Sequence, residues 1–383
     1  MKRDIVTGID IGTNTTRVVV AELFKDSGSP RIIGTGTAES RGMRSGYVVN
    51  TGEVIKSIRN ALAAAEEESG IQIHSVFLSV GGIGLESVTG QGSIMISRAD
   101  NEVTELDMEK VVAEAQKKAD LVNKQIIETV PLFYKLDGKE IYGKPLGMKG
   151  SKLEMKALFV TSLEQHLNDL IFATEEAGVS VEDVVPAPIA ASLVALTKRQ
   201  RTVGCLLANI GAETVSIAVF EEGIPVSLEV FPIGSTDITN DIALGFQIPL
   251  EEAEDIKKGG VQTFERKKLA EIIEARLSDI FELIEAHLKK IDRNGLLPAG
   301  IILTGGGAGI STIEDFAKVA LMLPSRIAHL NPESQDSEIQ DSLWFVAYGL
   351  CIFGLNQSRE TKTSRNFKKM KGGIVSWFKQ LLP

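Results

Sequence analysis

The chain has 383 residues, of which 43% are hydrophobic and 24% are charged, and these ordinary globular values exclude a disordered or fibrous protein. The formal net charge is −10, yet residues 357–383 contain seven Lys or Arg and one Glu, a net charge of +6. Residues 1–356 therefore carry −16, which excludes nucleic acid as a partner of this body because phosphate binding needs a basic face.

The chain is expected to be cytoplasmic and to have no membrane span. Its longest apolar run, Leu343–Leu355, has 13 residues, whereas a membrane-spanning helix needs about 20, so a buried helix is predicted. Asp4 and Asp10 interrupt the N-terminal apolar segment, which argues against a signal peptide. Cys205 and Cys351 lie in apolar runs and are expected to be buried free thiols. The four histidines lie far apart, so no metal site built on His or Cys is expected.

A hairpin pattern occurs twice. In the first copy, "VTGIDIGTNTTRVVV", an apolar strand ends near Asp10, turns through Gly12–Thr15 and leaves as a valine-rich strand. The second copy, "GCLLANIGAETVSIAVF", follows about 200 residues later with Asn209 and Gly211–Thr214 in the same places. Threonine follows glycine by three residues in both, and β-branched residues dominate the flanks, as in hairpins with a tight turn. This duplication predicts two related lobes that face each other.

Helices and strands alternate around the two hairpins. The apolar spacing predicts a helix over Thr51–Ser69 that ends at Gly70, and another over residues 265–291. Thr104 and Asp107 form a capping-box pattern that begins a further helix. An α/β architecture follows from this mixture. We expect Leu106, Val111, Val112 and Ala115 to form the buried face of the capped helix.

The hairpin turns have the chemistry of phosphate-binding loops. Glycine lets backbone N–H groups approach a phosphate closely, and a threonine hydroxyl adds a donor. Asp10 lies where a carboxylate can hold Mg²⁺ through water. A third element, the predicted strand Ile301–Thr304, leads into Gly305–Gly307, which leaves room for a flat ring or a diphosphate. One such hairpin alone is typical of an ordinary turn, but two in register favour a site. P-loop and Rossmann motifs are absent from the sequence.

Two phosphate hairpins followed by "LTGGGAGI" are the plan of the actin and sugar-kinase superfamily. Three segments, "ESRGMRSGYVVNTGEVIKSIRNALAAAEEESG", "ETVPLFYKLDGKEIYGKPLGMKGSKLEMKALFV" and "PIGSTDITNDIALGFQIPLEEAEDIKKGG", resemble FtsA, the family of actin-like bacterial cell-division proteins. The resemblance covers essentially the whole chain. It implies an α/β, actin-like (ribonuclease H-like) two-lobed ATPase fold with an FtsA-type inserted subdomain, to which "PLGMKG" at 145–150 belongs.

The resemblance also implies domain boundaries. The first lobe would consist of residues 1–79, 160–195 and 331–356, the insert of 80–159, the second lobe of 196–235 and 296–330, and its outer subdomain of 236–295. "APIAAS" at 187–192 and "WFVAYGL" at 344–350 resemble the two helices that hinge the lobes. A basic flexible linker, 357–373, and an amphipathic helix, 374–383, would end the chain.

ATP with Mg²⁺ between the lobes is what the resemblance implies for the site. Glu254 and Lys257 would share a helix face that reaches the ribose and adenine, although a solvated charged face is the alternative. Asp10 would hold Mg²⁺ through water. The matching residues are Asp10, Gly12, Thr13, Asn14 and Thr15 in the first turn, Asn209, Gly211, Ala212, Glu213 and Thr214 in the second, Glu254 and Lys257, and Gly305, Gly306 and Gly307 over the adenine.

Two departures from the family pattern bear on hydrolysis. The family usually has Asp at the position of Asn209 and a pair of glycines where Ala212 and Glu213 stand. Asn cannot supply the charge that orders Mg²⁺-bound or attacking water, and a carboxylate at Glu213 repels phosphates unless it faces away. We therefore expect nucleotide binding with, at most, weak ATPase activity, and a catalytic residue is not assigned.

The resemblance implies partners as well: the C-terminal peptide of FtsZ held near residues 265–291, further copies of this chain in filaments, and other division proteins at the insert. Arg276 and Lys289 are candidate contacts for FtsZ, against the alternative that they only aid solubility. The rival function is a PilM-like nucleotide-binding scaffold for type IV pilus assembly, which would not ordinarily carry a basic linker and a terminal amphipathic helix.

The last ten residues have the spacing of a short amphipathic helix. Such a helix is too short to be stable in water and should fold against an anionic membrane, with the basic linker as the second attractive signal. Docking on the protein's own body is the alternative. Location on the cytoplasmic face of the bacterial membrane at the division site follows from this interpretation. The apolar face consists of Ile374, Val375, Trp377, Phe378, Leu381 and Leu382.

Overall fold

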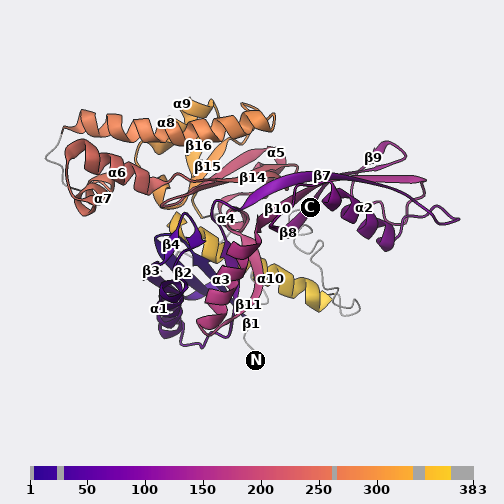
Figure 1. Ribbon diagram of the computed structural model, residues 1–383, viewed down its shortest axis with the longest axis horizontal. Coiled ribbons are helices and arrows are strands. Elements are labelled where there is room, and N and C mark those ends of the chain that lie inside the picture. Colours follow the sequence, from indigo (N-terminus) through magenta and orange to yellow (C-terminus); the bar gives the residue numbers. More distant parts are fainter. Residues whose placement is uncertain (1–3, 24–29, 261–264, 331–340, 364–383) are drawn as a thin grey trace.

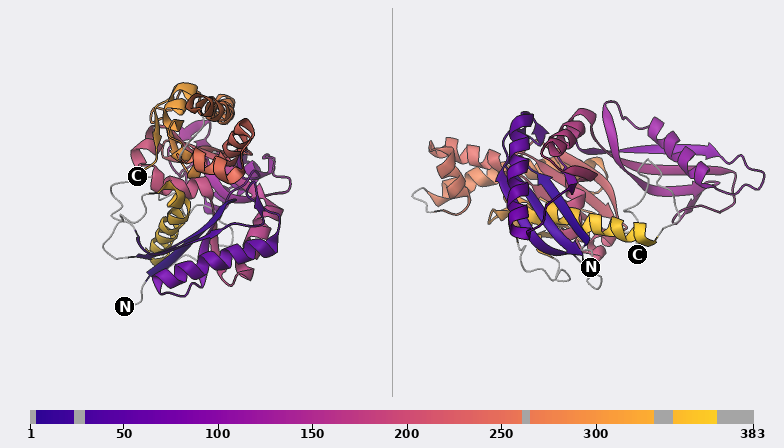
Figure 2. Two further views of the ribbon diagram at one scale, coloured as in Figure 1. Left: turned by 90° about the vertical axis from the view of Figure 1, so that its left-hand side faces the viewer. Right: turned by 90° about the horizontal axis from the view of Figure 1, so that it is seen from below.

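The computed structural model describes residues 4–23, 30–260, 265–330 and 341–363, and everything below concerns these residues. Figure 1 shows two lobes, one above the other, with one subdomain projecting from each to opposite sides. Figure 2 gives the same arrangement from two further directions. The predicted linker beyond Thr363 and the predicted amphipathic helix at 374–383 lie outside the described residues.

Each lobe is built on a five-stranded sheet, and the two sheets have the same connectivity. A three-stranded antiparallel meander comes first, and two parallel strands are then added beside its first strand. This agreement confirms the predicted duplication. The first sheet has the order β11 (Ser180–Pro186), β6 (Ser75–Val80), β1 (Asp4–Ile11), β2 (Thr15–Leu23) and β3 (Arg31–Glu39). The second sheet has the order β14 (Ile224–Phe231), β13 (Val215–Glu221), β12 (Cys205–Ile210), β15 (Ile301–Thr304) and β16 (Ser325–Ile327).

Two helices lie between the lobes. Helix α4 (Ala187–Ala195) packs against α10 (Phe345–Thr363), whose Phe345 and Tyr348 are fully buried. A Cβ at Gly349 would lie 1.9 Å from the Ala190 carbonyl oxygen, so only glycine permits this close approach. One apolar core runs from the first sheet through these helices to the near face of the second sheet. The predicted buried helix is therefore present, and the two segments expected to form a hinge are helices that pack against each other.

A separate core fills the far side of the second sheet. It is covered by α6 (Ser235–Phe246), α7 (Leu250–Lys257), α8 (Arg266–Lys290) and α9 (Ile313–Leu321). The helix predicted over 265–291 is α8. On the first lobe, α1 (Thr51–Ser69) ends at Gly70 as predicted, and the remaining elements are α3 (Glu164–Glu176) and the hairpin β4 (Met43–Arg44) and β5 (Tyr47–Val48). The short helix α5 (Lys198–Val203) packs against β13 of the second lobe.

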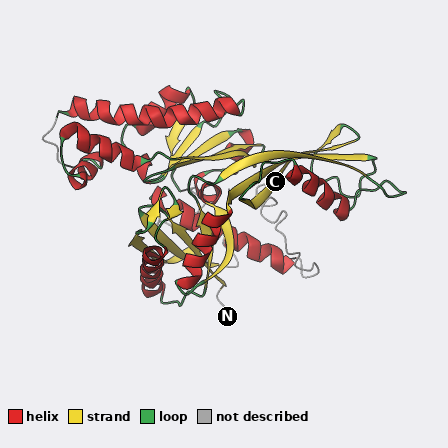
Figure 3. Ribbon diagram, in the orientation of Figure 1, coloured by secondary structure: helices red, strands yellow, loops and turns green. Residues whose placement is uncertain are grey.

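The inserted subdomain is a four-stranded antiparallel sheet of order β7 (Glu86–Met95), β10 (Lys152–Leu163), β8 (Lys124–Leu136) and β9 (Lys139–Ile141), drawn as long arrows in Figure 3. Helix α2 (Glu105–Lys117) covers one face and begins with the predicted Thr104–Asp107 capping box. The buried position predicted for Leu106 is wrong, because this side chain is 57% exposed. Met108 takes the inner position instead, since it lies three residues before Val111 on the same helix face.

The C-terminal boundary of the body also differs from the prediction. Helix α10 continues to Thr363, so residues 357–363, which the sequence places in the linker, are helical. None of the helices in the described ranges is long and apolar enough to cross a membrane. Cys205 and Cys351 are buried free thiols, as predicted.

Candidate nucleotide site between the lobes

A cavity of about 510 Å³ lies between the two lobes, and the predicted site residues converge on it. Both hairpin turns, the inner face of α7 and the turn after β15 contribute to its lining. Thirteen of the fifteen predicted residues line the cavity, and Glu213 and Gly307 do not. Those that line it are Asp10, Gly12, Thr13, Asn14, Thr15, Asn209, Gly211, Ala212, Thr214, Glu254, Lys257, Gly305 and Gly306.

The two hairpin turns have the same geometry. The Gly12 N–H donates to the Thr15 carbonyl oxygen at 3.2 Å, and the Gly211 N–H donates to the Thr214 carbonyl oxygen at 2.8 Å. A Cβ at either glycine would lie 2.9 Å from that same carbonyl oxygen, so both turns need glycine. One turn belongs to each lobe, and each presents backbone N–H groups and a threonine to the cavity.

Two residues of opposite charge lie across the first hairpin from each other and line the cavity. Arg17 lies opposite Asp10 in the β1–β2 ladder, and both line the cavity. Asp10 Oδ1 accepts a hydrogen bond of 2.6 Å from the Ser79 hydroxyl. Burial raises the pKa of Asp10, although Ser79 and Arg17 favour its charged form. Burial lowers the pKa of Arg17, which Asp10 and Asp341 counteract. The sequence reasoning did not identify the Arg17 guanidinium, a cation beside the hairpin turn that is predicted to bind phosphate.

The donor set suits a cation that arrives with phosphates. Within the described ranges, no group of three or more His, Cys, Asp or Glu could hold a metal ion. Asp10 is the carboxylate that lies beside the hairpin turns in the cavity. Mg²⁺ ordinarily keeps several waters and is bound by one or two carboxylates together with substrate phosphates, so these residues fit it.

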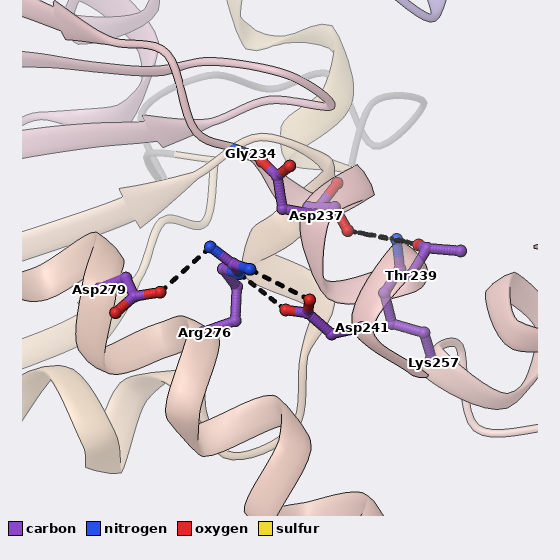
Figure 4. A network of polar contacts seen from close by, with 8 residues as sticks. Gly234, Asp237, Thr239, Asp241, Lys257, Arg276 and Asp279 are labelled. Atoms are coloured by element: carbon purple, nitrogen blue, oxygen red, sulfur yellow. Dashed lines mark hydrogen bonds and ion pairs between the residues drawn. The ribbon is translucent and has the colours of Figure 1, made fainter. Parts of the chain in front are cut away.

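A polar network on α7 marks the opposite end of the cavity. Lys257 Nζ lies 2.7 Å from Glu254 Oε2 and donates to the Thr239 hydroxyl at 2.8 Å and the Ser235 carbonyl at 3.0 Å. Figure 4 shows Lys257 beside Thr239. The Lys257 side chain is only 8% exposed, so the alternative of a solvated charged face does not hold for Lys257, whereas Glu254 is 35% exposed.

Comparison with known proteins agrees with this geometry. The model of "Cell division protein FtsA" matches residues 206–349, and that of "SHS2 domain inserted in FTSA" matches residues 82–161. Cell division protein FtsA of Pseudomonas aeruginosa is 30% identical, covering 93% of this chain and 90% of its own length. The chain belongs to the FtsA family. FtsA of Borreliella burgdorferi is also 30% identical, with coverage of 97% of this chain and 96% of the relative.

Solved structures share the actin-like fold of this FtsA-family chain. The PilM–PilN type IV pilus biogenesis complex matches with a TM-score of 0.68 and 17% identity, covering 91% of this chain and 98% of that one. MreB5 of Spiroplasma citri bound to AMPPNP matches with a TM-score of 0.55 and 14% identity, covering 94% and 98%. The predicted fold class, including the inserted subdomain, is therefore confirmed, and the likeness to PilM is one of fold.

Loss of the Glu254 charge should destabilise this FtsA-family protein in a pH-dependent way. Burial alone would raise the pKa of Glu254, but hydrogen bonds from Lys257 and Thr239 outweigh it and lower the pKa to about 2. Stability from a lowered pKa is complete above the ordinary value of 4.5 and disappears as the pH falls towards 2. We expect Glu254→Gln to cost about 1 kcal/mol at pH 7, because the carboxylate is partly exposed. Urea unfolding should show wild type and variant converging below pH 4.5; a constant difference would contradict the assignment.

Arg276 is not a free surface charge. Figure 4 shows it between two aspartates: Nε and Nη2 bind the Asp241 carboxylate at 2.7 and 3.0 Å, and Nη1 lies 3.1 Å from Asp279. The other candidate, Lys289, is bonded to Glu285 at 2.8 Å. Both candidate contacts for FtsZ therefore already have acidic partners, from α6 and α8 for Arg276 and from α8 alone for Lys289.

Glu213 and Gly307 lie behind the lining. Gly307 is buried, and a Cβ there would lie 2.3 Å from Ile210 Cγ2. The Glu213 carboxylate is not part of the lining and accepts a hydrogen bond from the Ser45 N–H. The lining also contains residues that the sequence reasoning missed: Arg17, Gly46, Gly81, Gly82, Lys258 and Ser342. Only Arg17 carried a readable signal, because it follows the first glycine turn on the strand opposite Asp10.

Proposed function

We propose that this FtsA-family protein binds ATP with Mg²⁺ between its lobes, assembles with further copies, and tethers FtsZ filaments to the cytoplasmic face of the cell membrane at the division site. The observation that carries the proposal is the paired geometry of the two glycine turns, one from each lobe, on a single cavity. A site built from both lobes makes their closure depend on the ligand, which is what a switch for assembly needs.

The phosphates of ATP would lie between the hairpin turns. Backbone N–H groups after Gly12 and Gly211 surround them, the Thr13 hydroxyl adds a donor, and the Arg17 guanidinium supplies a positive charge. Mg²⁺ would neutralise phosphate charge, with Asp10 holding it through water. MreB5 of Spiroplasma citri, a neighbour in fold, was solved bound to ADP and to AMPPNP, which supports a nucleotide in this cavity.

The nucleoside would lie at the α7 end. The Glu254–Lys257 pair is held by Thr239, which fixes the positions of its charged groups for contact with a ribose or adenine. Gly305 and Gly306 carry no side chains that would exclude a flat ring. Transfer of a phosphate from ATP to another substrate would require a catalytic aspartate in addition to these groups, and the proposal assigns no residue to that role.

Asn209→Asp should raise Mg²⁺-dependent ATP hydrolysis at least about tenfold. The side chain lines the cavity and ends β12 in the place where relatives usually have aspartate. A carboxylate there can order the attacking water, and positioned acid–base groups contribute about 10²–10⁴-fold. Phosphate release at saturating ATP measures the effect, with Asn209→Ala as the control that lacks the charge. Equal rates of hydrolysis in Asn209→Asp and Asn209→Ala would show that the absence of aspartate at position 209 is not what limits ATP hydrolysis.

The C-terminal peptide of FtsZ is proposed to bind the subdomain around α8, and other division proteins are proposed to bind the insert. The pairing of Arg276 with Asp241 leaves the guanidinium 29% exposed, so a peptide carboxylate would have to share or replace Asp241. If a folded variant without residues 236–295 still bound FtsZ, this placement would be wrong.

The alternative function, a PilM-like scaffold for pilus assembly, is supported by fold alone, whereas the sequence relatives are FtsA proteins. Co-sedimentation with FtsZ on anionic liposomes tests the proposed function as a whole. FtsZ should reach the liposomes only when this protein is present, and more of it should do so with ATP. FtsZ that stays in the supernatant under every condition would overturn the proposal.

A further inference from the structure

The hairpin β4–β5 lies at the edge of the first lobe that faces the second, as Figure 1 shows for β4. Its two-residue turn consists of Ser45 and Gly46, with φ of +48° and +81°, the backbone of a tight primed turn. A Cβ at Gly46 would lie 2.3 Å from the Gly82 Cα, so the turn rests directly on the backbone after β6.

Consecutive N–H groups of this turn donate to the two phosphate-type loops. The Gly46 N–H donates to the Thr13 hydroxyl of the first lobe at 3.1 Å. The Ser45 N–H donates to Glu213 Oε2 of the second lobe at 2.5 Å. The second bond therefore joins the lobes directly beside the phosphate end of the cavity, because Gly46 and Ala212 both line it.

Both ends of this interlobe bond are firmly held. Tyr47 packs edge-on against His166, with ring centroids 4.6 Å apart, and His166 Nε2 lies 3.0 Å from the Gly81 carbonyl oxygen. On the other lobe, the Thr236 N–H donates to the Ala212 carbonyl at 2.8 Å, which ties the loop to the start of α6. Because each partner of the Ser45–Glu213 hydrogen bond is fixed to its own lobe, the lobes cannot separate at this point without breaking the bond.

We propose that Glu213 is a positioning residue that latches the two lobes together at the phosphate end and thereby slows nucleotide exchange. The carboxylate is outside the cavity lining, and its Oε2 is engaged by the Ser45 amide. A hydrogen bond to a charged, half-buried acceptor is strong enough to hold such a contact. The nucleotide arm of the test of this latch rests on the proposed function.

Amide hydrogen exchange in nucleotide-free protein tests the latch independently of ATP. The Ser45 amide should exchange at least tenfold slower than in an unstructured peptide, and Glu213→Ala should remove this protection. The Gly46 amide is the internal control, because its acceptor, Thr13, belongs to the same lobe and its protection should persist. Glu213→Gln should retain protection within about threefold, since its amide oxygen still accepts a hydrogen bond. An unprotected Ser45 amide in the wild type would overturn the latch without any variant, as would Glu213→Gln exchanging as fast as Glu213→Ala.

Release of a fluorescent ATP analogue by stopped flow tests the consequence. Glu213→Ala should release it about tenfold faster, and Glu251→Ala, which removes an exposed carboxylate at the start of α7, should not change the rate. Unchanged release from Glu213→Ala would overturn the role in exchange. If no analogue bound to any form while Ser45 remained protected, the proposed nucleotide function would fail and the latch would stand.

Discussion

Gly12→Val should weaken ATP binding at least about 100-fold, a loss of about 2.7 kcal/mol. Even a single Cβ at this position would lie 2.9 Å from the Thr15 carbonyl oxygen, which accepts the hydrogen bond that closes the turn. The turn must shift to admit it, and the two methyl groups of valine would then occupy space where the backbone otherwise approaches a phosphate. The nucleotide loses backbone donors and meets a branched side chain in their place.

Isothermal titration with ATP and Mg²⁺ measures the effect, and Gly52→Val is the matched control. Gly52 lies in the first turn of α1, where an added Cβ would meet only Asn50 Oδ1 at 3.6 Å, an ordinary contact. Its ATP affinity should equal that of the wild type. Both variants should unfold cooperatively, so that a loss of binding can be assigned to the turn. Wild-type affinity in Gly12→Val would refute the assignment of the first phosphate loop.

The hairpins, the strand before the triple glycine and the helices on either side could be predicted because their signals are local. A glycine turn between β-branched runs and a capping box at Thr104 need no knowledge of the remaining fold. The two copies, the triple glycine and the resemblance to FtsA together identified thirteen residues that the structure brings around one cavity. Arg17 was missed although the predicted hairpin already implied the β1–β2 pairing that places it opposite Asp10.

Side-chain partners across the fold account for the remaining errors. Arg276 looks like a surface charge in the sequence, but Asp241, 35 residues earlier, lies on the adjacent helix and binds it with two hydrogen bonds. From the sequence, Glu213 is expected to lie close to phosphates, but its carboxylate accepts a hydrogen bond from the N–H of Ser45, which is 168 residues away in the sequence. Such pairs join distant segments, and no local pattern in one sequence predicts them.

The end of the body illustrates a different difficulty. The segment 357–363 is polar and charged, which is typical of a linker, but α10 continues through it. Extension of a helix that has already formed costs little free energy, so polar and charged residues can continue a helix whose first part is buried. The predicted linker is therefore shorter than the sequence suggests, and seven fewer residues separate the body from the segment at 374–383.

Trp377→Glu should abolish binding of the protein to anionic liposomes, with a loss of at least about 30-fold in partitioning. The predicted apolar face would lose about 2 kcal/mol of tryptophan burial, and a negative charge near anionic lipid would cost about 1 kcal/mol more. Ser376→Glu is the matched control, because it adds the same charge one residue earlier, on the predicted polar face. Its effect should be limited to the charge, and therefore be several-fold smaller.

The tail should bind only weakly as a single copy, because one short amphipathic segment with a basic linker gives marginal anchoring. Assembly changes this: several tails on one filament raise the effective concentration of each at the surface, so avidity grows without new contacts. Liposome flotation of truncated protein ending at Lys371, compared with the full chain, should therefore show a loss that increases with protein concentration. A Trp344→Phe background leaves Trp377 as the reporter, whose emission should shift to the blue with lipid and return at high salt. Emission already blue-shifted without lipid would show instead that the tail docks on the protein's own body, and equal flotation of the truncated form would exclude the anchor.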